Sequence, residues 1–226
     1  MKKSFAAYSI TFLILLVATT EMFAQYTPGT YKGSAYGRSD KEHNGLVEVE
    51  VTVSADKIDD IKVVTYNQSV DHKKYGTPVN EAKTKTPAQI LEKQKLDADV
   101  VTDATMASTA IELAVAKALQ QAVAKKYTPG TYKGSAMGRE DKEHDGKIEV
   151  EVTVSADKID DIKVLTYNQS VDHKKYGPQV NEAKTKTPAQ ILEKQSLDAD
   201  VVTDATMASS AIELAVARAL EQARVK

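Results

Sequence analysis

Hydrophobic and polar residues alternate strictly between Leu46 and Val53, with valines on one side and glutamate or threonine on the other. Such alternation is typical of a strand that is buried on one face. A second alternating segment, residues 58–66, follows a short polar turn and is predicted to be its hairpin partner. The shorter segment 29–35 is also β-compatible, and Gly33 within it indicates a bulge or a close approach of another backbone. Residues 37–45 between the first two strands are predicted to form an exposed charged loop.

The apolar pattern stops after residue 66, so residues 67–86 are predicted to form a polar loop. Thr86-Pro-Ala-Gln89 then has the pattern of a capping box with proline at the first helical position, which predicts a short helix over 87–94. From Met106 to Leu119 apolar residues recur at helical spacing on one face. A second capping-box pattern, Thr109-Ala-Ile-Glu112, leaves the start of this helix open by one turn. The fold class is therefore α+β, an antiparallel sheet with helices packed on one side.

The whole pattern occurs twice. Residues 26–125 recur at 127–226, with 14 differences in 100 positions. A repeat of this length is the size of a domain and much longer than a solenoid repeat. We therefore predict two small, separately folded domains in tandem, residues 25–125 and 126–226, joined near Lys125 and Lys126 with almost no linker.

Residues 1–24 differ from the rest of the chain. They begin with Lys2 and Lys3, continue with the apolar run 10–18 and end at Ala24 before Gln25. A positively charged start, a short apolar middle and small residues at the cleavage site are typical of a secretory signal peptide. The apolar run is short for a membrane span. We expect export, to the periplasm or outside the cell, with cleavage near Ala24. An uncleaved anchor is the alternative.

Composition excludes several classes of function. The formal net charge is −2 with charges interspersed, so nothing predicts nucleic-acid binding. The chain has no cysteine, which excludes disulfides, thiolate iron–sulfur ligation, thioether-linked haem and a cysteine-linked lipid anchor. His43 and His72 lack paired spacing, so no metal site is expected. A redox role outside the cytoplasm would need an organic cofactor.

The strongest candidate site is the stretch Asp99-Val-Val-Thr-Asp-Ala-Thr105, repeated at Asp200–Thr206, directly before the last helix of each copy. A polar turn that places a hydroxyl in the first turn of a helix suits a phosphate, because free backbone N–H groups and the positive end of the helix dipole meet there. The simpler interpretation is that Thr105 only caps the helix.

With Tyr31-Lys-Gly33 at its start and the same order of parts, each copy resembles, almost end to end, the FMN-binding domain family of sodium-translocating NADH:quinone reductase and Rnf-type complexes. The resemblance implies FMN joined by a phosphoester to the last hydroxyl residue of the motif, installed by a flavin transferase that uses FAD. The attachment residues would be Thr105 and Thr206. The other motif positions correspond to Asp99, Asp200, Thr102, Thr203, Ala104 and Ala205.

Two departures from the family pattern stand out. Asp103 and Asp204 replace the motif glycine. Aspartate is among the few residues that tolerate the left-handed region, but its carboxylate would repel a phosphodiester. Tyr66-Asn-Gln-Ser69 replaces a His-x-Glu-Thr-type run. Here Tyr66 or Tyr75 could stack on the flavin, and Lys73 and Lys74 could offset the phosphate or simply lie on the surface. Contacts to the flavin edge are expected from Gln68, Gln169, Ser69 and Ser170.

The predicted function is that of an exported flavoprotein that transfers electrons between redox proteins, soluble or membrane-bound, with one flavin per domain. No catalytic residues are assigned, since the chain has no dinucleotide fingerprint and fits an electron-transfer protein better than a stand-alone enzyme. Two alternatives stay open. One is a flavin-free duplicated surface module for binding or structure, and the other is an oxidoreductase acting directly on small acceptors.

Overall fold

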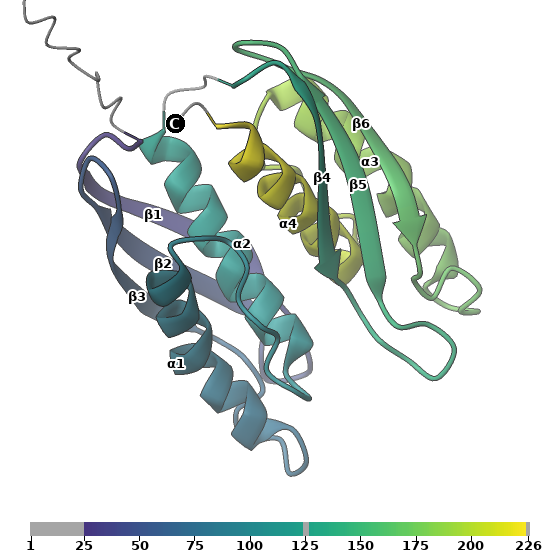
Figure 1. Ribbon diagram of the computed structural model, residues 1–226. Helices are drawn as coiled ribbons and strands as arrows, with labels where there is room; N and C mark the ends of the chain where they lie inside the picture. The colour runs from purple at the N-terminus through teal and green to yellow at the C-terminus, as the bar shows by residue number, and fades with distance from the viewer. Residues whose placement is uncertain (1–24, 124–126, 225–226) are drawn as a thin grey trace, which may run out of the picture.

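The computed structural model describes residues 25–123 and 127–224. Each copy folds as one antiparallel sheet with two helices on one face (Figure 1), so the predicted α+β class is confirmed. The predicted signal peptide and the junction at Lys125 and Lys126 lie outside the described residues. Within the described ranges, no helix has the length and apolar character needed to cross a membrane.

In the first copy the elements are β1 (Gly29–Tyr36), β2 (Leu46–Val53), β3 (Ile58–Tyr66), α1 (Gly76–Lys93) and α2 (Thr105–Ala122). The second copy repeats them as β4 (Gly130–Met137), β5 (Lys147–Val154), β6 (Ile159–Tyr167), α3 (Gly177–Lys194) and α4 (Thr206–Ala223). The strand orders are β1-β2-β3 and β4-β5-β6, each pair antiparallel. All three strands predicted in the first copy are therefore present, within one residue of the expected ends.

The alternation in β2 has the predicted consequence. Val47, Val49 and Val51 are fully buried beneath the helices, while Glu48 and Glu50 on the opposite face keep contact with solvent. This one-sided burial leaves the second face of each sheet polar. The core of each copy therefore lies between its sheet and its last helix.

Gly33 marks the point where α2 crosses β1. A Cβ atom at this position would lie 1.9 Å from the carbonyl oxygen of Ala114, and a Cβ atom at Gly134 would lie 1.9 Å from the carbonyl oxygen of Ala215 in the second copy. The close backbone approach expected at Gly33 is thus present. It lets the helix lie directly on the sheet, which positions the start of the helix at one end of the sheet.

The prediction of a polar loop over 67–86 is wrong in its second half. Helix α1 begins at Gly76. Pro87 lies inside this helix, whereas the capping-box pattern predicts it at the first helical position. The capping-box interpretation of Thr86 fails for the same reason, since Thr86 is buried in mid-helix. The error has a physical cause: Ala82 is fully buried on the inner face of this first half, while the polar residues around it are exposed.

Helices α2 and α4 pack against each other between the two sheets (Figure 1). Both are buried on more than the one face predicted from the pattern, with Leu113 and Leu214 each 1% exposed. Two ion pairs join the helices in a nearly symmetric way: Arg218 Nη2 lies 2.6 Å from Glu112 Oε2, and Lys117 Nζ lies 2.8 Å from Glu213 Oε2. One hydrophobic cluster runs through both copies. Each copy thus has its own sheet and helices, while the hydrophobic core is continuous across both copies.

Candidate functional site

The backbone before α4 turns sharply at Asp204. This residue has φ of 63° and its counterpart Asp103 has φ of 64°, both in the left-handed region that the motif glycine would favour. The helix follows with Ala205 as the capping residue and Thr206 as its first residue, and no side chain caps the helix start. Aspartate therefore preserves the turn, while the first backbone N–H groups of the helix stay free of a side-chain cap.

Thr105 occupies the same position at the start of α2, after Ala104 as capping residue. It does not act as an N-cap, so the simpler interpretation of this residue is not supported. Helix α2 begins at Thr105 and not one turn later, as the second capping-box pattern would have allowed. Thr109 lies inside the helix, where it is buried and donates a hydrogen bond of 2.9 Å to the carbonyl oxygen of Met137. Thr105 and Thr206 are both partly exposed.

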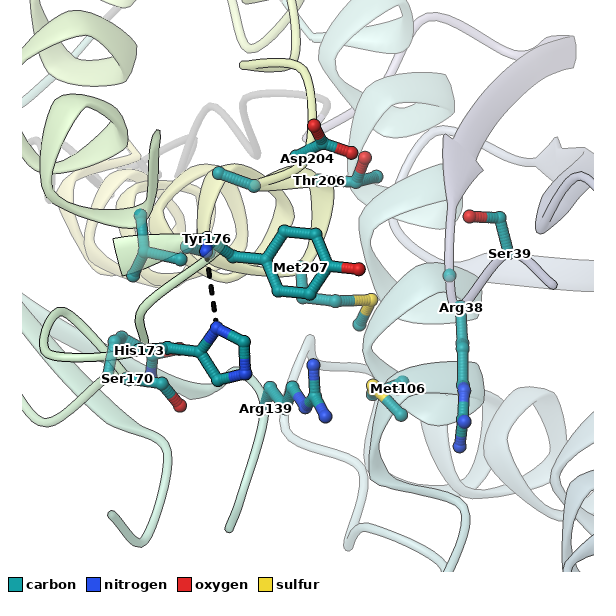
Figure 2. Close-up of a pocket in the computed structure, with 15 residues that line it drawn as sticks. Arg38, Ser39, Met106, Arg139, Ser170, His173, Tyr176, Asp204, Thr206 and Met207 are labelled. Carbon is teal, nitrogen blue, oxygen red and sulfur yellow. Dashed lines mark hydrogen bonds between the residues drawn. The ribbon is translucent and has the colours of Figure 1, made fainter. Parts of the chain in front are cut away.

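A pocket of about 360 Å³ opens beside the start of α4 (Figure 2). This volume is within the range of small-molecule sites. Its wall comes from both copies: the loop after β1, the first turn of α2, the loop after β4, the β6–α3 loop, and the first turn of α4. The lining residues are Gly37, Arg38, Ser39, Met106, Arg139, Gln169, Ser170, His173, Tyr176, Val180, Asp204, Ala205, Thr206, Met207 and Ala208.

The pocket brings together part of the predicted site. Gln169, Ser170, Ala205 and Thr206 all line it. Asp200 does not, because its carboxylate pairs with Lys194 Nζ at 3.1 Å, as Asp99 pairs with Lys93 at 3.2 Å. The motif residues Thr102 and Thr203 are exposed, and Thr203 is not part of the lining. The motif therefore divides into a binding end near the helix and a surface end before it.

Gln169 and Ser170 also hold the neighbouring loop. Gln169 is 2% exposed and its Nε2 donates to the carbonyl oxygen of Gly146 at 2.5 Å, while the Ser170 hydroxyl donates to Asp141. In the first copy Gln68 donates to Gly45 and Ser69 donates to Asp40 in the same way. These hydrogen bonds fix the loop that carries Arg139, or Arg38 in the first copy, at the pocket.

The two tyrosines considered for stacking have different surroundings. The hydroxyl of Tyr66 donates to the carbonyl oxygen of Val79 at 2.5 Å, and burial raises its pKa. Its counterpart Tyr167 is not among the pocket-lining residues. Tyr176, the counterpart of Tyr75, does line the pocket and stacks on His173 with ring centroids 4.9 Å apart. Tyr75 and Tyr176 are therefore the better candidates for contact with an aromatic ligand.

A lysine lies beside each of these tyrosines. Lys175 Nζ lies 4.7 Å from the Tyr176 ring centroid. The pKa of Lys175 is raised by its hydrogen bond to Tyr176 and by attraction to that hydroxyl, and Asp204 acts in the same direction. Lys74 stands in the same relation to Tyr75 and Asp103. A cation thus partly offsets the charge that aspartate introduces in place of glycine.

Sequence reasoning missed the arginines and methionines of this pocket. Arg38 and Arg139 belong to loops expected to be merely exposed and charged, and Met106 reaches the Thr206 pocket from the other copy. In the described ranges, neither guanidinium has a hydrogen bond or ion pair. Figure 2 shows Arg38 and Met106 across the pocket from Tyr176 and His173. No sequence signal marks them, because their proximity depends on how the two copies pack.

The fold and the site together define a tandem of α+β domains with a pocket suited to an anionic, aromatic ligand. Among the residues that the structure describes, helix N–H groups without a side-chain cap, guanidinium groups without a hydrogen bond or ion pair, and a tyrosine surround one hydroxyl. The model of the FMN-binding domain matches residues 42–120 and 143–221. The chain belongs to this family, with two copies of the domain.

Each relative matches a stretch about as long as one copy of the domain. An uncharacterized protein of Treponema pallidum is 37% identical over 98 residues, which cover 43% of this chain and 24% of that protein. The NADH:acrylate oxidoreductase of Vibrio harveyi is 38% identical over 98 residues, covering 43% of this chain and 9% of that protein. A crystal structure of the CPE2226 protein from Clostridium perfringens matches 43% of this chain and 88% of that one, with 23% identity and a TM-score of 0.35.

Proposed function

We propose that the protein carries one FMN on each domain, joined by phosphoesters to Thr105 and Thr206, and transfers electrons between redox proteins outside the cytoplasm. The observation that carries the proposal is the geometry at the start of α4. Thr206 is the first residue of α4 and its side chain does not cap the helix. It lines the pocket, and Asp204, two residues before it, adopts the left-handed backbone conformation of the turn.

The residues present fit this cofactor. The first-turn N–H groups of α4 and the helix dipole favour a phosphate on Thr206 by about 0.3–1 kcal/mol at an exposed position. Arg38 and Arg139 supply further positive charge, and Tyr176 offers an aromatic face. Bound flavin would supply the ability to accept and release electrons, while these side chains hold and orient it.

The name of one relative supports a role in electron transfer. The Vibrio harveyi protein carries the name of an NADH-dependent oxidoreductase, and this chain corresponds to a small part of it. A flavin domain within a larger oxidoreductase is consistent with passing electrons to or from other redox centres. The partners proposed here are therefore a flavin transferase that uses FAD, which would load the protein, and redox proteins that can be membrane-bound.

Export is proposed from the pattern of residues 1–24. A charged start, an apolar run and a small-residue exit are features of a signal peptide. A covalent tether would keep the flavin from diffusing away once the protein is outside the cytoplasm. Cleavage near Ala24 would release the protein to the periplasm or the extracellular space.

Intact mass spectrometry tests the attachment. The full chain, produced with a flavin transferase and exported, is expected to gain two FMN-sized additions. Thr105→Ala and Thr206→Ala should each remove one addition, and the double variant should remove both. Thr185→Ala is the control, because this exposed hydroxyl lies outside both the attachment motif and the pocket lining and should leave both additions in place.

An unmodified mass, obtained while the transferase modifies a known substrate, would contradict covalent attachment. If such a preparation also failed to bind added FMN, the flavin-free module would become the better account. Turnover of small acceptors by the purified protein alone would favour the stand-alone oxidoreductase.

A further inference from the structure

The pocket at Thr206 is not built by one domain alone. Arg38 and Ser39 come from the loop after β1, and Met106 comes from α2, all in the first copy. Met106 directly follows Thr105, the corresponding attachment residue, in the chain. The two proposed flavin sites are therefore adjacent, and Met106 lies at the boundary between them.

The packing between the copies is symmetric at this place. Ser210 in α4 donates a hydrogen bond of 3.1 Å to the carbonyl oxygen of Tyr36, at the end of β1. Thr109 in α2 donates one of 2.9 Å to Met137, at the end of β4. The loop after β4 consequently meets α2 as the loop after β1 meets α4. By this symmetry, Arg139 and Glu140 correspond at the Thr105 site to Arg38 and Ser39 at the Thr206 site.

The symmetry is broken at one position. When each of the residues lining the Thr206 pocket is compared with its counterpart 101 positions away, all are identical except Ser39, whose counterpart is Glu140. Both side chains are exposed, and Glu140 has no ion pair among the residues that the structure describes. The symmetry therefore assigns an additional carboxylate, from the other domain, to the edge of the Thr105 site.

From this difference we infer that the two flavin sites are inequivalent, and that Glu140 gives the flavin on Thr105 a lower reduction potential than Ser39 gives the flavin on Thr206. The inference rests on the proposed function. Reduction adds negative charge to a flavin, and a nearby carboxylate disfavours that charge. At surface dielectric this interaction shifts the equilibrium between the two sites toward a reduced Thr206 flavin by roughly fivefold.

The tandem then has a direction. With FMN on both threonines, the two electrons and the proton lost by one group would be those gained by the other, and Glu140 would favour their residence on the Thr206 group. Met106 and Met207 line the boundary between the two sites. The first domain would accept electrons from a donor protein, and the second would deliver them.

Single-flavin proteins test this. Thr105→Ala leaves the flavin on Thr206, and Thr206→Ala leaves the flavin on Thr105. Anaerobic potentiometric titration, followed by visible absorbance, should give the higher midpoint potential for the Thr105→Ala protein. Adding Ser39→Glu to it should lower that potential. Adding Glu140→Ser or Glu140→Gln to the Thr206→Ala protein should raise its potential toward that of the other site.

Asn44→Asp is the matched control in the Thr105→Ala protein. It introduces the acid that the second copy has at Asp145, in the same loop as Ser39 but outside the pocket lining, and should leave the potential unchanged. Intact mass separates the two proposals. A protein without attached flavin contradicts the proposed function, whereas loaded proteins with equal or reversed potentials, or potentials indifferent to residues 39 and 140, overturn the inference.

Discussion

Asp204 shows how one residue can replace another when the backbone requirement is met. Its φ of 63° is unfavourable for most side chains but tolerated by aspartate. The departure from the family's glycine therefore changes the charge of the site more than its shape. Lys175 beside Tyr176 partly offsets that charge.

We expect Asp204→Gly to leave the free energy of unfolding within about 1 kcal/mol of the wild-type value, because glycine adopts this conformation readily. Asp204→Val should lower it by about 1–2 kcal/mol, because a β-branched side chain is strained in the left-handed region. Denaturant unfolding of both variants measures the difference. Equal stability of the two would show that the turn does not depend on this backbone conformation.

Gly33 is required for a different reason, namely the contact between helix and sheet. Gly33→Ala should destabilise the fold by about 3 kcal/mol or more, because its Cβ would lie 1.9 Å from the backbone of α2. Gly29→Ala in the same strand is the matched control. Its Cβ would meet only the ring of Tyr31, at 3.2 Å, and should cost less than about 1 kcal/mol. Thermal or chemical unfolding that ranked the two variants equally would contradict this account of the crossing.

At the scale of elements, α2 and α4 bury charge where a simple amphipathic helix would not. Glu112 and Glu213 are each at most 2% exposed, and burial raises the pKa of both to about 7 despite Arg218 and Lys117, which act in the opposite direction. These carboxylates bind across the interface, so they tie each domain to the other. They also make the stability of that interface depend on pH.

Between pH 4.5 and about 7 the folded protein retains protons on Glu112 and Glu213 that the unfolded chain has released. The free energy of unfolding should therefore decrease as pH rises through this window, by up to about 1.4 kcal/mol per pH unit for each group. Glu112→Gln combined with Glu213→Gln should flatten the dependence, as measured by denaturant unfolding at several pH values. A double variant with the wild-type slope would assign the effect to other groups.

At the scale of the whole molecule, the two copies have diverged in a complementary way along their interface. Glu221 accepts a hydrogen bond from the backbone N–H of Leu96. Burial raises the pKa of Glu221, although this hydrogen bond and Lys95 act in the opposite direction. At the equivalent place Gln120 accepts from Leu197 and from the hydroxyl of Ser196. Each copy thus matches the other, and two identical copies would not reproduce both pairings.

Separate fragments 25–125 and 126–226 should therefore associate with each other in preference to themselves, because each alone exposes the face of α2 or α4 that is buried in the tandem. Native mass spectrometry of an equimolar mixture is expected to show mainly the mixed dimer. Well-folded monomers of both fragments at the same concentration would contradict the role of the shared core.

Sequence alone determined the α+β class, the duplication, the three strands of each copy and the position of the threonine at the start of the last helix. These features follow from local alternation, from repetition and from a contiguous motif, all of which are written along the chain. It misplaced the start of α1, because a helix with a single fully buried alanine in its first half carries little apolar pattern.

Only the tertiary structure decided which residues surround Thr206. Arg38, Ser39 and Met106 reach the pocket from the other domain, about 100 residues or more away in the chain, and nothing local marks them. The continuous core and the buried carboxylates have the same origin, since burial of a second helix face depends on what packs against it. Local sequence specifies the fold of each domain, whereas the packing of α2 on α4 brings residues of both domains together around the pocket.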